Sequence, residues 1–84
     1  MQVQIKKQTN AVHPNEALIT IATVDGAEQL VVHRRSIEDD RLEIGYPIST
    51  DGDKYLIELP RETLSGLWRI WVPRGALFEE RQYA

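Results

Sequence analysis

Cysteine is absent from the 84 residues of the chain, and this absence removes two classes of architecture. Without thiols the chain has neither a disulfide framework nor a thiolate metal site. Small secreted domains usually depend on such cross-links, so we expect an intracellular, cytoplasmic protein. The two histidines, His13 and His33, have no metal-ligand spacing with each other or with an acidic cluster, so no metal site is predicted.

Long apolar runs are missing as well. The longest, such as Leu30–Val32, fall far short of the roughly 20 residues that a membrane span needs, and the first fifteen residues hold no apolar block typical of a signal peptide. Thirteen acidic residues against ten basic ones give a net charge of −3, which removes a general attraction to nucleic acid or anionic lipid. We therefore expect no membrane partner and disfavour nucleic acid.

Catalytic motifs are the third absence. The chain has no G-x-S-x-G elbow, no H-E-x-x-H pair and no glycine-rich phosphate loop. Its length suits a single domain, 1–84, with a modest core in which a substrate-sized pocket is hard to accommodate. The sequence therefore predicts no enzyme, no catalytic residue and no cofactor.

Short apolar segments separated by polar residues are what the chain does have, and this rhythm is typical of β-strands. No repeat is visible. An antiparallel meander of six strands is predicted, over Met1–Lys7, Leu18–Val24, Ala27–His33, Leu42–Ile48, Tyr55–Pro60 and Leu67–Val72. Two Asp-Gly pairs, Asp25-Gly26 and Asp51-Gly52, are strong hairpin signals. The charged connection 34–41 has room for one helical turn.

The register of the predicted hairpins defines an inner face. With each Asp-Gly pair as a two-residue turn, Ile21 lies opposite Leu30, and three apolar pairs form in the second hairpin: Ile48 with Tyr55, Tyr46 with Ile57 and Ile44 with Leu59. In the third hairpin Leu59 meets Trp68, Ile57 meets Ile70 and Tyr55 meets Val72. The predicted core is Ile19, Ile21, Leu30, Val32, Ile44, Ile48, Ile57, Leu59, Trp68 and Ile70.

An all-β fold follows from these strands. No predicted helix is long enough to cover an open sheet, so we expect a small bent barrel or a two-sheet sandwich, SH3-like or OB-like in size. Residues 74–84 form a short C-terminal helix or a flexible tail in this interpretation, with a continued edge strand as the alternative.

The outer face of the last two strands is the main candidate binding surface. The same register places Leu56 opposite Trp71 and Glu58 opposite Arg69, both pairs pointing outward. Tryptophan and arginine are enriched at binding hot spots. Two hypotheses follow: either Leu77 and Phe78 cover Trp71, or the face binds a protein partner or a second copy of the chain. A protein-interaction or self-association module is the leading functional hypothesis.

Two alternative ligands remain. Aromatic and basic residues in the C-terminal half suit single-stranded nucleic acid, bound through Tyr46, Arg69, Trp71 and Arg74, although acidic residues in the same half oppose it. The densest cationic site, His33-Arg34-Arg35, suits an anion or an acidic segment. In the competing interpretation, Arg34, Arg35 and Arg41 only neutralise Glu38-Asp39-Asp40 in the same connection.

Overall fold

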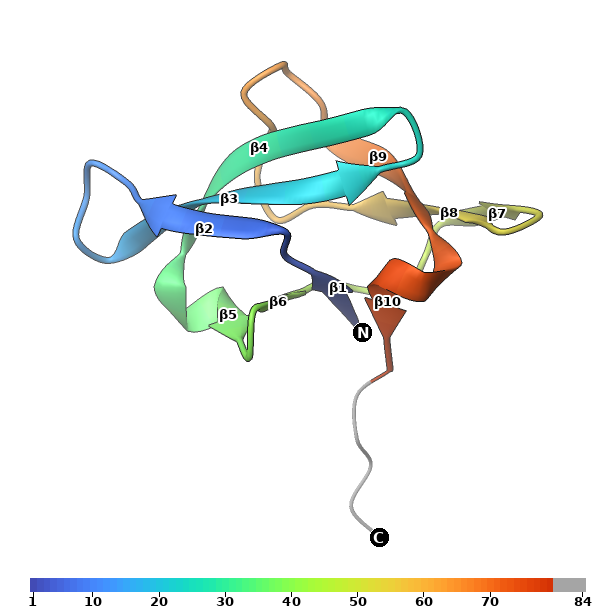
Figure 1. The fold of residues 1–84 in the computed structure, drawn as a ribbon, viewed down its shortest axis with the longest axis horizontal. Coiled ribbons are helices and arrows are strands. Elements are labelled where there is room, and N and C mark those ends of the chain that lie inside the picture. Colours follow the sequence, from blue (N-terminus) through green and yellow to red (C-terminus); the bar gives the residue numbers. More distant parts are fainter. Residues whose placement is uncertain (80–84) are drawn as a thin grey trace, which may run out of the picture.

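The computed structural model describes residues 1–79, which form ten short strands and two 3-10 turns (Figure 1). The strands are β1 Gln2–Gln4, β2 Lys7–Asn10, β3 Glu16–Thr23, β4 Gly26–His33, β5 Ile37–Glu38, β6 Arg41–Glu43, β7 Ser49–Asp51, β8 Lys54–Glu58, β9 Arg69–Pro73 and β10 Leu77–Phe78. The turns are η1 Arg34–Ser36 and η2 Arg74–Ala76. In this part of the chain no helix is long and apolar enough to cross a membrane.

The strands form three small antiparallel sheets, so the all-β prediction is confirmed, but the sheets do not close into a barrel. The first sheet has the order β10-β1-β6-β5, the second β2-β3-β4 and the third β7-β8-β9. A backbone hydrogen bond joins the second and third sheets: the N–H of Val24, in the turn between β3 and β4, donates to the carbonyl of Trp71 in β9 at 3.0 Å. The first predicted strand is divided between two sheets, as β1 and β2.

An internal repeat, absent from the sequence prediction, organises the described residues. The series β1-β2-β3-β4-η1-β5 recurs as β6-β7-β8-β9-η2-β10, with the second strand of each series pairing with the third and the third with the fourth. The two series end alike: the N–H of Arg34 donates to the carbonyl of Asn15, and the N–H of Arg74 donates to that of Asp53, both at 2.9 Å.

The two halves exchange their last strands in the first sheet. β5, from the first half, pairs with β6 of the second, and β10, from the second half, pairs with β1 of the first. At the centre β1 pairs with β6, with Val3 opposite Leu42. Flanking bonds of 2.9 Å run from Ile5 N–H to the Asp40 carbonyl and from Ile44 N–H to the Met1 carbonyl. Each half therefore completes the sheet of the other.

The core lies between the sheets and contains eight of the ten predicted residues. The buried apolar residues are Val3, Ile5, Ala17, Ile19, Ile21, Leu30, Val32, Leu42, Ile44, Ile57, Leu59, Ile70 and Val72. Ile48 and Trp68 were wrongly predicted, because each lies just outside a strand and is exposed, at 45% and 54%. Both Ile48 and its neighbour Ser49 lie against Leu56, an arrangement that resembles a β-bulge and breaks the alternation of faces.

The first two hairpin registers were each wrong by two residues. Leu30 pairs with Ile19, not Ile21, because the turn is Val24–Asp25. Likewise Tyr55 pairs with Thr50, not Ile48, and the other two pairs predicted for that hairpin do not form, because the turn is Gly52–Asp53. There Gly52 has a φ of +61°, which suits glycine at the first central position. A shift of two residues keeps every side chain on the same face of the sheet, so this error did not change which residues were predicted to be buried.

The third hairpin register is confirmed: Leu56 pairs with Trp71, Ile57 with Ile70 and Glu58 with Arg69. The chain end differs from the helical prediction, because Arg74–Ala76 is a single 3-10 turn; β10 is an edge strand, as in the alternative, but it belongs to the first sheet and does not continue β9. Leu77 pairs with Val3 and packs against the core, and Phe78 pairs with Gln2. Both residues therefore belong to the first sheet. The rest of the predicted tail, 80–84, lies outside the described residues.

The turn between β5 and β6 places two consecutive aspartates in the left-handed region, with φ of 52° at Asp39 and 60° at Asp40. These signs at both central positions define a type I′ turn, for which Asn-Gly is the preferred pair. We predict that Asp39→Asn combined with Asp40→Gly raises the free energy of unfolding by about 0.5–1 kcal/mol, measured by urea denaturation.

The matched control for this turn is Asp39→Asn combined with Asp40→Asn, which removes the same two charges and keeps both Cβ atoms. An equal gain in this control would attribute the effect to charge and contradict the conformational explanation.

Candidate functional site

Three connections differ in length between the halves. Residues 5–6 join β1 to β2, whereas 44–48 join β6 to β7, and the other two differences are in hairpin loops. β8 and β9 are joined by ten residues, 59–68, whereas β3 and β4 of the first half are joined by the two residues Val24–Asp25. β2 and β3 are joined by 11–15, whereas the two residues Gly52–Asp53 join β7 and β8. The repeat closes with two-residue turns at both places, so the longer loops are not required by the fold. Insertions into a repeated framework often carry its binding surface.

Loop 59–68 exposes three large apolar side chains within five positions. Leu64 is 66% exposed, Leu67 is 45% exposed and Trp68 is exposed as well. Elsewhere in the described chain the other exposed large apolar residues are Val12, Val24, Tyr46 and Ile48. Loop 59–68 thus holds the largest group of such side chains within a short segment of the described chain, and clustered exposed apolar side chains mark interaction sites.

The buried residue Thr63 fixes the shape of this loop. Its side chain is 3% exposed, and its Oγ1 accepts a hydrogen bond from the Leu67 N–H at 3.0 Å and shares another with the Ser65 hydroxyl. The Thr63 N–H donates to the Leu67 carbonyl at 2.8 Å. Gly66, with φ of +94°, closes the turn between them and donates its N–H to the Thr63 carbonyl. The exposed side chains therefore project from a hydrogen-bonded frame.

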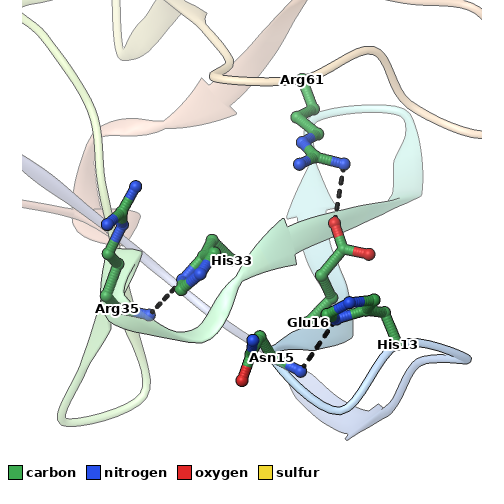
Figure 2. Close-up of polar contacts among 6 residues, drawn as sticks. All are labelled: His13, Asn15, Glu16, His33, Arg35 and Arg61. Carbon is green, nitrogen blue, oxygen red and sulfur yellow. Dashed lines mark hydrogen bonds and ion pairs between the residues drawn. The ribbon is translucent and has the colours of Figure 1, made fainter.

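Contacts with the first half hold the loop along the edge of β4. Leu64 N–H donates to the Gln29 carbonyl at 2.8 Å, and the Ser65 hydroxyl donates to the Glu28 carboxylate. At the other end the Arg61 guanidinium forms an ion pair of 2.8 Å with Glu16, the first residue of β3 (Figure 2). The loop thus covers a strand edge that would otherwise be open.

Loop 11–15 is fixed by Arg34, one of the predicted anion-binding residues. Its Nη2 donates to Asn10 Oδ1 at 2.7 Å and its Nε to the Pro14 carbonyl at 3.1 Å. Arg34 is therefore engaged within the chain. The competing prediction has Arg34, Arg35 and Arg41 neutralise the acidic residues 38–40. In the described structure Arg41 lies opposite Glu38 across β5 and β6, but its guanidinium lies 3.7 Å from the centre of the Phe78 ring, and no ion pair joins the three arginines to those acidic residues.

Three side chains of loop 11–15 and the end of β4 with η1 have unused hydrogen-bond donors: His13, His33 and Arg35. His13 Nδ1 accepts from the Asn15 N–H, and His33 Nδ1 accepts from the Arg35 N–H, each at 3.2 Å (Figure 2). In a neutral imidazole the proton is then on Nε2, which has no partner among residues 1–79 in either case. The exposed Arg35 guanidinium likewise has no partner within the described chain.

The predicted outer face of β8 and β9 forms, but its apolar side chains are less exposed than those of loop 59–68. Leu56 and Trp71 lie opposite each other and are both half-buried. Arg69 is paired with Glu58 at 3.3 Å, both side chains being more than half exposed. Arg74 is exposed on η2, and Tyr46, 82% exposed, lies in the connection between β6 and β7. No hydrogen bond, ion pair or ring contact within the described structure links Tyr46 or Arg74 to Trp71.

Sequence reasoning missed the apolar loop because it assigned Trp68 to the core. A signal was present, since Leu64 and Leu67 flank Ser65-Gly66, a turn dipeptide. The chain matches no protein-family model, and no curated protein or solved structure is significantly similar to it. Among residues 1–79, no group of three or more His, Asp or Glu side chains is arranged to hold a metal ion.

We predict that Thr63→Val loosens loop 59–68, because the Leu67 N–H loses its side-chain acceptor. The free energy of unfolding should fall by about 1 kcal/mol, measured by urea denaturation, and the Leu67 amide should exchange with deuterium faster. Thr63→Ser keeps the hydroxyl and is the control. Unchanged exchange at Leu67 in the valine variant would contradict the anchoring role.

Proposed function

We propose that this chain is a non-catalytic interaction module that binds a protein partner through loop 59–68. The observation that carries the proposal is the exposure of Leu64, Leu67 and Trp68 on a loop whose backbone is already held by hydrogen bonds. An ordered loop loses little further conformational freedom on binding, and tryptophan is enriched at the residues that dominate binding energy.

The outer face of β8 and β9, around Leu56, Arg69 and Trp71, is a second candidate contact surface of the same functional class. It is supported by a tryptophan and a leucine side by side on a solvent-facing sheet. Its apolar pair is half-buried and its arginine is engaged by Glu58, so we rank it below the loop.

Photo-cross-linking in cells tests the loop directly. With p-benzoylphenylalanine in place of Leu64, we expect a discrete protein adduct, because this side chain stands at the centre of the proposed contact. The same group in place of Val24, in the equivalent turn of the first half, should give none. Absence of an adduct at position 64 would overturn the proposal.

Two tryptophan variants separate the two surfaces. Trp68→Ser should abolish the adduct formed at position 64, whereas Trp71→Ser should keep it, because Trp68 belongs to the loop and Trp71 belongs to β9. Circular dichroism should establish that both variants fold. The reverse result would assign binding to the outer face.

Single-stranded nucleic acid is the alternative ligand, and the exposure of Tyr46 and Arg74 is what favours it. Stacking on Tyr46 requires no sequence specificity, and phosphate contacts depend steeply on salt. If the protein-binding proposal is right, a labelled mixed 20-nucleotide strand should show no change in fluorescence anisotropy at low ionic strength. Binding that is lost with Tyr46→Ser would favour the alternative.

A further inference from the structure

We propose that the partner of loop 59–68 is an acidic protein segment, one that carries carboxylates beside bulky apolar side chains. This inference rests on the proposed function and names the chemistry of the partner. It draws on a second group of residues, His13, His33 and Arg35, which lie at the end of the β3–β4 hairpin marked by the Arg61–Glu16 pair (Figure 2).

These three side chains present only donors. Each histidine uses Nδ1 to accept a backbone N–H, which leaves Nε2–H directed elsewhere, and Arg35 contributes a planar guanidinium. A group that only accepts hydrogen bonds and carries negative charge matches each of these side chains, which lie apart with His33 between the other two (Figure 2), and an ionised carboxylate is the protein group that does both.

No acidic residue of the described chain forms an ion pair with His13, His33 or Arg35, so their donors are free to bind a carboxylate of a partner. Glu16, the acidic residue at this end of the hairpin, is engaged by Arg61 at 2.8 Å. Glu38, Asp39 and Asp40 follow Arg35 closely in sequence but form no ion pair with it in the described structure. Because the chain has a net charge of −3, an acidic segment is disfavoured over most of the surface, so the unpaired donors add selectivity.

The donors and the apolar loop are joined by Arg61. This residue belongs to loop 59–68 and reaches Glu16 at the end of loop 11–15, next to His13 (Figure 2). From there the loop follows the edge of β4 to Leu64 and Ser65. A segment that lies along this line meets carboxylate-binding donors at one end and exposed apolar side chains at the other.

Selection from a random library tests the inference without knowledge of the natural partner. Phage-displayed random 12-residue peptides are selected on the immobilised full-length chain, and the enriched sequences are resynthesised and measured by fluorescence anisotropy. We expect enriched peptides to combine Asp or Glu with large apolar residues. Arg35→Gln should weaken their binding roughly tenfold, and a rise in salt should weaken it as well.

Lys54→Gln is the matched control, since it removes one exposed positive charge from β8, outside both loops. Trp68→Ser should weaken the same peptides, because it removes an apolar anchor. Peptides without acidic residues, or acidic peptides that bind Arg35→Gln as tightly as the unaltered chain, would overturn the inference.

The outcomes separate this inference from the proposed function. Apolar peptides that lose affinity with Trp68→Ser but not with Arg35→Gln would leave the loop as a binding surface and overturn the acidic partner alone. So would a cross-linked protein adduct at position 64 without any enriched peptide. Affinity for oligonucleotides that depends on Arg35 would also overturn it, since phosphate would then be the anion received.

Discussion

The pairing of β1 with β6 is the interaction on which the rest of the structure depends. Val3 and Leu42 face each other there, both fully buried, and two reciprocal backbone bonds flank them. Each of these strands begins one half of the repeat and also receives the last strand of the other half. Neither half completes its sheet alone, so the core is shared. A chain of 84 residues has little core to spare, and the buried apolar residues of both halves form a single cluster.

Alternation of apolar residues predicted which side chains are buried better than it predicted which residues pair. The first two registers were wrong by two residues, yet Ile19, Ile21, Leu30 and Val32 are buried as expected. A shift of two preserves the face, so the pattern contains no information that distinguishes the two registers. The deciding factor was turn chemistry: Asp-Gly was placed at the two central positions, whereas Gly26 begins β4 and Gly52 comes first in its turn.

The repeat was not predicted from the sequence because the two halves have the same residue at few equivalent positions. Buried Val32 and Val72 are equivalent, as are Arg34 and Arg74, which begin the two 3-10 turns. The surface residues between them differ, and the loops differ in length. Trp68 was assigned to the core because alternation continues through it, but β9 begins only at Arg69, and Leu59 and Ile70 already close the inner layer at that end. Where a strand ends is a tertiary property that periodicity does not contain.

The contrast between the halves separates the residues that the framework requires from those that it does not. The first half joins β3 to β4 with two residues, so the same framework has no structural need for ten residues between β8 and β9. Leaving a large apolar side chain exposed forgoes about 1.5–3 kcal/mol of burial, and loop 59–68 does so at Leu64 and, in part, at Leu67 and Trp68. It also uses a buried threonine and bonds to β4 to hold its shape. Ordering a loop while leaving its apolar side chains in water stabilises the isolated chain poorly, and this combination is the physical basis of the binding role that we propose for the loop.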